Sequence, residues 1–299
     1  MMERRKLGKT DMNVSVLGFG GSEVGYERAS SATVKKLLNQ ALDAGLNVID
    51  TASAYRESEA LIGAAVAHRR NELVLLTKCG ATDGFARYDW STEGILRQIE
   101  QSLARLRTDH LDLVQLHSCS AAILAKGEAI DGLRRAREKG WTRFIGYSGD
   151  GDDALFAIES GAFDTLQTSV SVADQEAISL TIPRAMAKGM GVIAKRPVAN
   201  VAWRWSGSPP DAYHRPYWER LRKLRYEFQA KPLGEAVGAA LRFTIGVDGV
   251  HTAIVGTRSL GRWQENARAL AAGPLSAAEF EAIRTRWCEV ADPSWTGQR

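Results

Sequence analysis

The sequence LNVIDTASAYRESEA, residues 46–60, combines a short aliphatic run with two polar side chains that a folded core does not explain. The aliphatic run ends in a carboxylate, Asp50, and an isolated Tyr55 follows in a polar segment. Buried parallel strands read as continuous aliphatic runs. A titratable residue at the end of such a run therefore indicates a strand whose carboxyl end carries chemistry.

Two further aliphatic runs end in the same way. LVLLT, residues 73–77, is followed by Lys78, and LDLVQL, residues 111–116, is followed by His117. In a (β/α)₈ barrel the carboxyl ends of the strands converge on one face, where active sites are built. We therefore expect these two residues to meet the earlier pair there, as the site of a carbonyl reductase.

Aliphatic runs alternate with amphipathic stretches along the whole chain. Eight strands are predicted, at residues 16–19, 48–50, 73–77, 113–116, 144–147, 164–167, 192–194 and 252–255. Strands separated by helical patterns indicate a parallel sheet, and eight of them indicate closure. The predicted fold class is α/β, a (β/α)₈ TIM barrel in a single domain over residues 1–299, with Ser31 as a helix cap. An N-terminal hairpin, a long insertion after strand seven (197–231) and a C-terminal helix (276–290) complete it.

Composition excludes several classes of partner. The net charge of +4 comes from 39 basic and 35 acidic residues, a balance that argues against nucleic acid. Three cysteines with no metal-like pairing suit a reducing compartment. No run is long enough to span a membrane, and the first residues have no apolar core for export. A cytoplasmic protein with no membrane partner is expected, and nothing in the sequence assigns an oligomeric state.

The stretch DAGLNVIDTASAYRESEALIGAAV, residues 43–66, resembles the signature of the aldo-keto reductase family. Lys78 in LLTKCG and His117 in LVQLHS fall where the second and third motifs of that family do. The resemblance extends over nearly the full length of the chain. It implies a (β/α)₈ barrel, a nicotinamide cofactor bound without a Rossmann domain, and reduction of small aldehydes or ketones.

Each of the four residues has a chemical role in that reaction. Hydride addition to a carbonyl leaves negative charge on oxygen, which needs a proton and stabilisation. A free tyrosine, with a pKa near ~10, is a poor acid at neutral pH. We expect Lys78 to lower the pKa of Tyr55, the proton donor, and Asp50 to hold Lys78 in place. His117 would orient the substrate oxygen by a hydrogen bond.

Each of these residues also has a structural interpretation. Each of the four, taken alone, could serve a structural purpose such as capping or packing. A metal site built from His117, Cys119 and Cys79 lacks a fourth ligand and any usual spacing, so no metal is predicted.

The cofactor phosphates are expected near the carboxyl end of the chain. The glycines at 18–21 fail as a Rossmann fingerprint, because Glu23 stands where the third glycine belongs. In IVGTRSLGRWQEN, residues 254–266, Gly256 permits close backbone approach, and Arg258 and Arg262 are cations beside a helix start. A solvated basic helix start is the plainer alternative.

The family resemblance refines this expectation. It places a basic residue and a serine on the adenosine 2′-phosphate and a Glu-Asn pair on adenine, and Arg258, Ser259, Glu265 and Asn266 match that pattern. NADP (NADPH) is therefore the expected cofactor, with NAD as the alternative.

At the nicotinamide end the chain departs from the family. Ser148 and Gln167 stand where the resemblance implies carboxamide ligands, but Gly149 replaces the asparagine that often follows the serine. Lys195 stands where an aromatic residue commonly stacks on the nicotinamide. A cation cannot stack as tyrosine does, so another aromatic residue supplies that face or the ring is held less tightly.

The insertion at 197–231 interleaves aromatic and basic residues. Such a pattern can bind single-stranded nucleic acid. Pro216, followed by apolar residues up to Phe228, instead indicates a helix with a packed face, and a long loop at the catalytic end of a barrel is typical of a lid. At least one of Trp203 and Trp205 is expected to line the substrate pocket. The alternative is that both only pin the insertion to the barrel.

The predicted function is an NADPH-dependent oxidoreductase that reduces a small-molecule aldehyde or ketone to an alcohol. One alternative is a nicotinamide-binding regulatory protein with slow turnover. Another is a sugar or alcohol dehydrogenase that runs in the oxidative direction with NAD.

Overall fold

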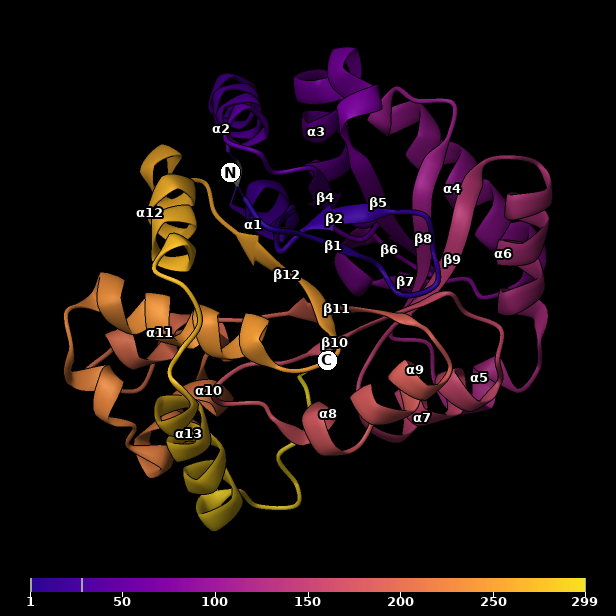
Figure 1. The fold of residues 1–299 in the computed structure, drawn as a ribbon. Coiled ribbons are helices and arrows are strands. Elements are labelled where there is room, and N and C mark those ends of the chain that lie inside the picture. The colour runs from indigo at the N-terminus through magenta and orange to yellow at the C-terminus, as the bar shows by residue number, and fades with distance from the viewer. Residues whose placement is uncertain (1, 28, 299) are drawn as a thin grey trace.

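Eight parallel strands close into a barrel surrounded by helices (Figure 1). The computed structural model describes residues 2–27 and 29–298. The barrel strands, in the order in which they pair, are β3 (Leu17–Gly20), β4 (Val48–Asp50), β5 (Val74–Cys79), β8 (Leu111–His117), β9 (Thr142–Ser148), β10 (Thr165–Ser169), β11 (Gly191–Lys195) and β12 (Val250–Gly256), which pairs with β3. The predicted fold class and all eight predicted strands are confirmed.

The larger outer helices carry the apolar stripes expected of helices that cover a barrel. They are α2 (Ser31–Asp43), α3 (Ser58–Val66), α4 (Thr92–Leu106), α6 (Glu128–Glu138), α7 (Gly151–Glu159), α9 (Ile182–Ala187), α11 (Leu233–Gly246) and α12 (Leu260–Ala271). Helix α4 buries Ile95, Ile99 and Leu103, spaced four residues apart, against the barrel. Ser91 caps it by accepting a hydrogen bond from the backbone N–H of Gly94.

The cap of α2 corrects one prediction. Ser31 was expected to cap this helix, but Ser31 is its first residue. Ser30 is the cap, and its hydroxyl oxygen accepts a hydrogen bond from the backbone N–H of Thr33 at 3.1 Å. Adjacent serines give the same sequence pattern, and only the extended backbone at Ser30 distinguishes the two.

Shorter elements connect the strands and the larger helices. Most were not predicted: α1 (Ser22–Tyr26), η1 (Ala67–Glu72), the hairpin β6 (Ala81–Thr82) and β7 (Arg87–Tyr88) with η2 (Asp83–Phe85) at its tip, α5 (Ala121–Leu124) and α8 (Glu176–Ser179). The insertion contains η3 (Ala199–Arg204), α10 (Arg215–Leu224) and η4 (Glu227–Ala230). The predicted helix after Pro216 exists but ends before Phe228, because Arg225 adopts a left-handed backbone. Helix α13 (Ala277–Val290) matches the predicted C-terminal helix.

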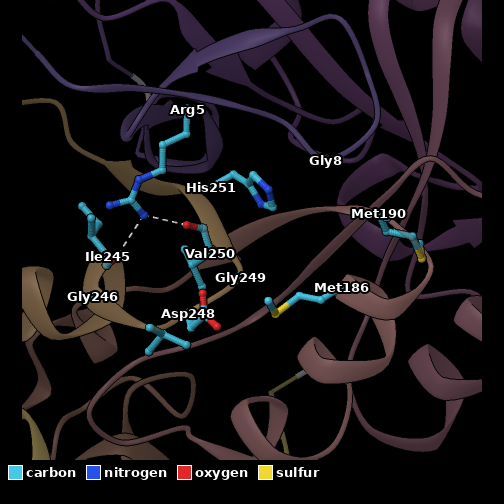
Figure 2. Close-up of a pocket in the computed structure, with 12 residues that line it drawn as sticks. Arg5, Gly8, Met186, Met190, Ile245, Gly246, Asp248, Gly249, Val250 and His251 are labelled. Carbon is cyan, nitrogen blue, oxygen red and sulfur yellow. Dashed lines mark hydrogen bonds between the residues drawn. The ribbon is translucent and has the colours of Figure 1, made fainter.

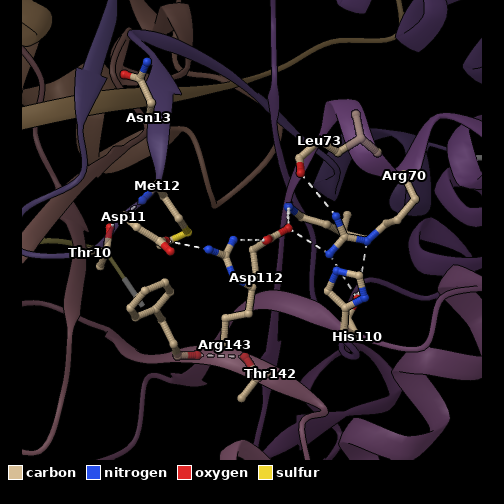
Figure 3. A network of polar contacts seen from close by, with 12 residues as sticks. Thr10, Asp11, Met12, Asn13, Arg70, Leu73, His110, Asp112, Thr142 and Arg143 are labelled. Carbon is tan, nitrogen blue, oxygen red and sulfur yellow. Dashed lines mark hydrogen bonds and ion pairs between the residues drawn. The ribbon is translucent and has the colours of Figure 1, made fainter.

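The predicted N-terminal hairpin, β1 (Arg4–Lys6) with β2 (Asn13–Ser15), lies at the amino-terminal end of the barrel. A buried carboxylate ties the elements there together (Figure 3). Asp112, at the start of β8, forms ion pairs with Arg70 at 2.8 Å and Arg143 at 2.7 Å, and accepts a hydrogen bond from the backbone N–H of Leu75. Arg143 also pairs with Asp11 in the hairpin. This end of the barrel is therefore stabilised by charge pairs between distant segments.

A cavity of about 590 Å³ opens at the same end (Figure 2). Arg5 crosses it and donates hydrogen bonds to the backbone carbonyls of Ile245 and Val250. The start of β12 and the turn before β11 form its other walls. The cavity lies at the opposite end of the strands from Asp50, Lys78 and His117, so it is not where the sequence predicts chemistry.

No helix among residues 2–27 and 29–298 is both long and apolar enough to cross a membrane.

Candidate functional site

A buried ion pair lies at the carboxyl ends of β4 and β5. Lys78 Nζ donates to Asp50 Oδ2 at 2.6 Å and to the backbone carbonyl of Thr51 at 2.9 Å. Both side chains are almost fully buried. Gln115 on β8 reaches the other carboxylate oxygen, Oδ1, at 3.4 Å. The ammonium of Lys78 is therefore fixed in position by neighbours on both sides.

Tyr55 lies over this pair, in the loop that follows β4. Lys78 Nζ is 5.2 Å from the centre of the tyrosine ring, and the ring of His117 lies 5.5 Å from it, edge-on. The loop is held tightly, because a Cβ on Gly25 in α1 would collide with the carbonyl of Tyr55. The structure thus brings together Asp50, Tyr55, Lys78 and His117.

Burial sets the protonation state of Tyr55. Burial raises the pKa of the tyrosine well above its usual value, and the negative charge of Asp50 raises it further. The expectation that the pKa of Tyr55 is lowered is therefore wrong, because the net shift is upward. The charge of Lys78 is paired with that of Asp50, and burial lowers the pKa of Lys78 itself. Tyr55 consequently holds its proton at neutral pH.

His117 is a neutral imidazole. Burial lowers the pKa of His117 well below its ordinary value, and the positive charges of Lys78, Lys195 and Arg196 lower it further. Its Nδ1 is buried and has no hydrogen-bond partner within the described part of the chain. Phe85, at the tip of the β6–β7 hairpin, packs edge-on against the ring at 4.8 Å. The site therefore offers a neutral hydrogen-bonding group beside a protonated phenol.

Two basic residues, Lys195 and Arg196, lie at the end of β11 and also belong to the rim formed by the carboxyl ends of the strands. Only Lys195 was expected there from the sequence. Lys195, expected at the aromatic stacking position, instead forms a 2.8 Å ion pair with Asp150 after β9. Arg196 follows it and donates to Ser169 Oγ at 2.9 Å and to Tyr213 Oη at 2.7 Å. Consecutive charges directly after a predicted strand were the pattern that could have revealed Arg196.

The two residues expected at the nicotinamide carboxamide stand side by side. Ser148 on β9 pairs in register with Gln167 on β10 and with His117 on β8. Ser148 and Gln167 are both buried. Position 149 requires glycine rather than the asparagine common in the family, because a Cβ there would collide with the hydroxyl of Tyr147. Gln115 Nε2 lies 3.4 Å from Gln167 Oε1, which links this group to Asp50.

The residues expected at the adenosine end lie together at the end of β12 and the start of α12. Arg258 is exposed and forms a 2.6 Å ion pair with Glu27, just after α1. Arg262 pairs with Glu265 at 2.9 Å. The remaining predicted residues are placed with them: Gly256 ends β12, Ser259 precedes the first residue of α12, and Asn266 is buried on that helix.

This region fits the phosphate end of a dinucleotide in two respects. A helix of twelve residues, α12, begins there, and its first backbone N–H groups favour an anion. Its cap, Ser259, makes no side-chain hydrogen bond to those groups. Glu27 was not predicted. Its carboxylate forms an ion pair with Arg258, the residue expected to bind the 2′-phosphate.

The two tryptophans expected in the substrate pocket pack in different ways. Trp203 packs edge-on against Phe228 at 6.0 Å and belongs to the edge of the hydrophobic core. The guanidinium of Arg204 lies 3.9 Å from the ring centre of Trp205, and the ring of His214 packs edge-on against Trp205 at 4.8 Å. Tyr213, next to His214, is bound to Arg196, so this part of the insertion reaches the catalytic rim.

Comparison with known proteins matches this geometry. The model of the Aldo/keto reductase family matches residues 16–287. L-galactose dehydrogenase of Arabidopsis thaliana is 28% identical, with 90% of this chain and 88% of that protein aligned. 6-dehydroglucose reductase of Novosphingobium aromaticivorans is 32% identical over 55% of this chain and 57% of its own length. The holo-form structure of aldo-keto reductase AKR11C1 from Bacillus halodurans superposes with a TM-score of 0.83 at 26% identity, covering 96% of both chains.

Proposed function

Because this chain belongs to the aldo/keto reductase family and is an NAD(P)-dependent oxidoreductase, we propose that it reduces an aldehyde or ketone to an alcohol with NADPH. The observation that carries the proposal is the half-buried, protonated Tyr55 beside the Lys78–Asp50 pair and the neutral His117. A phenol that keeps its proton at neutral pH suits a proton donor to a developing alkoxide.

In this proposal a bound reduced nicotinamide supplies the hydride, and the chain supplies everything else. Tyr55 Oη donates its proton to the carbonyl oxygen. His117 donates a hydrogen bond to the same oxygen and directs the carbonyl toward the tyrosine. Lys78, held by Asp50, places a positive charge beneath the tyrosine and stabilises the phenolate left after proton transfer.

Ser148 and Gln167 are proposed to hold the nicotinamide carboxamide, since they lie side by side next to His117 on neighbouring strands. Arg258, Ser259 and Arg262 are proposed to hold the adenosine phosphate, with Glu265 and Asn266 near the adenine. The basic start of α12 supports this orientation.

One observation favours an alternative, an NAD-linked dehydrogenase of a sugar or alcohol. The carboxylate of Glu27 lies on Arg258, where it would repel a 2′-phosphate. The name of the Arabidopsis relative, L-galactose dehydrogenase, points the same way. We prefer the reductase, because oxidation needs a tyrosinate as base and burial opposes that form.

Isotope transfer tests the proposal. NADPH deuterated at C4 of the nicotinamide would be mixed with the protein and a panel of aldehydes and ketones, and the alcohols analysed by mass spectrometry. We expect one deuterium at the former carbonyl carbon of at least one substrate. Absence of deuterated alcohol from every substrate, with NADPH binding intact, would favour the regulatory protein with slow turnover.

A further inference from the structure

Arg196 has an unusual set of partners for a cation at the rim of an active site. Its Nε donates to Tyr213 Oη at 2.7 Å, and its Nη1 donates to Ser169 Oγ at 2.9 Å and to the backbone carbonyl of Gln298 at 2.7 Å. All three acceptors are neutral. Its Nη2 has no hydrogen-bond acceptor among residues 2–27 and 29–298.

The charges around it leave Arg196 as the surplus cation. Lys78 is paired with Asp50 at 2.6 Å, and Lys195 is paired with Asp150 at 2.8 Å. Within the part of the chain that the structure describes, no carboxylate forms an ion pair with Arg196. A part-buried guanidinium loses hydration that neutral acceptors replace only in part, so an anion brought to it would be bound strongly.

Arg196 lies close to the reacting groups. It directly follows β11, whose last residue, Lys195, pairs in register with Ser169 on β10. Its charge lowers the pKa of His117 and opposes the rise in the pKa of Tyr55. Arg196 therefore lies at the same carboxyl ends of neighbouring strands as His117, Ser148 and Gln167. The adenosine 2′-phosphate of the cofactor is instead proposed to lie near Arg258.

We propose that Arg196 anchors an anion subsite beside Tyr55 that binds the carboxylate of an acidic carbonyl substrate, such as an aldehyde or keto acid. The inference rests on the proposed reductase function and names the substrate class of that site. Nη2 is free to donate one hydrogen bond, and Nη1 gains a second when the carbonyl of Gln298 yields to the carboxylate. Two parallel N–H···O bonds of this kind match the geometry of a carboxylate.

Residues near the end of the chain take part in this arrangement. Arg220 Nη2 donates to the backbone carbonyl of Thr296 at 2.8 Å, two residues before the carbonyl on Arg196. Trp295 packs on Trp287 of α13 at 5.5 Å. Two backbone carbonyls of the tail, residues 292–298, thus accept hydrogen bonds from Arg196 and Arg220. In the proposal, the tail forms one side of the subsite.

The test uses two aldehydes that differ in one charge: 4-carboxybenzaldehyde and its neutral methyl ester, methyl 4-formylbenzoate. With wild-type protein and NADPH we expect a higher kcat/KM for the acid. Arg196→Gln should lower kcat/KM for the acid by about 10-fold or more, the scale of a charge-assisted hydrogen bond, and change that for the ester less than about 3-fold. NADPH affinity, followed by cofactor fluorescence, should stay near wild type.

Arg222→Gln is the matched control, because Arg222 is an exposed arginine of α10 that stacks on Trp218 at 4.8 Å. It should leave both substrates unchanged. Raising the ionic strength supplies a second measurement that needs no variant: KM of the wild type should rise for the acid and not for the ester. Arg196→Lys, which retains the charge, should restore part of the preference for the acid.

The outcomes separate the possible roles of Arg196. Equal losses for acid and ester, or a loss of NADPH affinity, would overturn the proposal and assign Arg196 to the cofactor diphosphate. No change for either substrate would assign it to holding the tail. If the wild type shows equal kcat/KM for the ester and the acid, only the anion subsite is refuted. If it reduces no carbonyl compound, the proposed reductase function is refuted.

Discussion

In the proposed function, four side chains from three strand ends and one loop carry the chemistry, and the sequence identified all four as candidates. The direction in which the pKa of Tyr55 is shifted was not predictable from sequence. A lysine near a tyrosine lowers the pKa of the phenol in isolation, but burial and the negative charge of Asp50 outweigh it here. Burial depends on how distant segments pack over the loop, including Phe85 and Tyr26, and no local pattern encodes that.

Cofactor choice is also decided at the level of single residues. In the proposed function Arg258 recognises the adenosine 2′-phosphate, so Arg258→Ala should weaken NADPH binding by roughly 1.5–3 kcal/mol and leave NADH nearly unchanged. Dissociation constants for both cofactors, from titration of cofactor fluorescence, measure this difference.

Glu27→Gln is the companion variant, because it removes the carboxylate that holds Arg258 at 2.6 Å. It should strengthen NADPH binding and leave NADH unaffected. If Arg258→Ala instead weakens NADH and NADPH equally, Arg258 does not read the 2′-phosphate.

At the scale of elements, the barrel was predictable because each strand carries its own aliphatic run. The rim was not. The β6–β7 hairpin brings Phe85 onto His117, and the tail brings a carbonyl onto Arg196, yet both segments are polar or short in sequence. Their positions come from contacts with residues far along the chain. The same limit explains the helix cap, where the local pattern could not choose between Ser30 and Ser31.

The insertion after β11 provides a prediction for an element. Trp203 packs on Phe228 at the edge of the core, so Trp203→Ala should lower the melting temperature and reduce kcat/KM for all substrates alike. Trp205 lies beside His214 and the Tyr213–Arg196 contact, so Trp205→Ala should change kcat/KM unevenly across a panel of aldehydes. Thermal melts and substrate profiles of the two variants distinguish these roles. Uniform effects from both would place the substrate wall elsewhere.

Across the whole molecule, chemistry and stabilising charge pairs lie at opposite ends of the barrel. The network around Asp112 joins the hairpin, β8 and β9 at the amino-terminal end, whereas Tyr55 and Lys78, the proposed catalytic residues, lie at the carboxyl ends. The sequence predicted that Asp50, Tyr55, Lys78 and His117 meet at one end, but none of the ion pairs at the other, since these join residues up to about 130 positions apart. That residues 1–299 form a single domain stays a prediction.

Stability should depend on pH through Asp174, which accepts a hydrogen bond from Tyr217 and lies 3.8 Å from Arg220. Burial, together with the charge of Asp150, raises the pKa of Asp174 to about 7. An unfolded aspartate titrates near ~4, so between these values the folded protein holds a proton that the unfolded chain releases. The contribution of this group to stability is therefore present below about pH 4 and lost as the pH rises through about 7.

Asp174→Asn cannot titrate, so it serves as the reference. The free energy of unfolding of the wild type, relative to this variant, should fall between about pH 4 and about pH 7 by on the order of 3 kcal/mol. Urea denaturation at several pH values measures the difference. A difference that stays constant with pH would show that Asp174 has an ordinary pKa in the folded protein.

The central claim is that Tyr55 gives its proton to the carbonyl during hydride transfer, and a single-turnover experiment tests it most directly. Wild-type protein and Tyr55→Phe, each saturated with NADPH, would be mixed with one aldehyde that the wild type reduces, and the loss of NADPH absorbance followed. We predict a rate lower by about 10²- to 10⁴-fold in the variant, with NADPH affinity unchanged. A variant that keeps most of the wild-type rate would contradict the account.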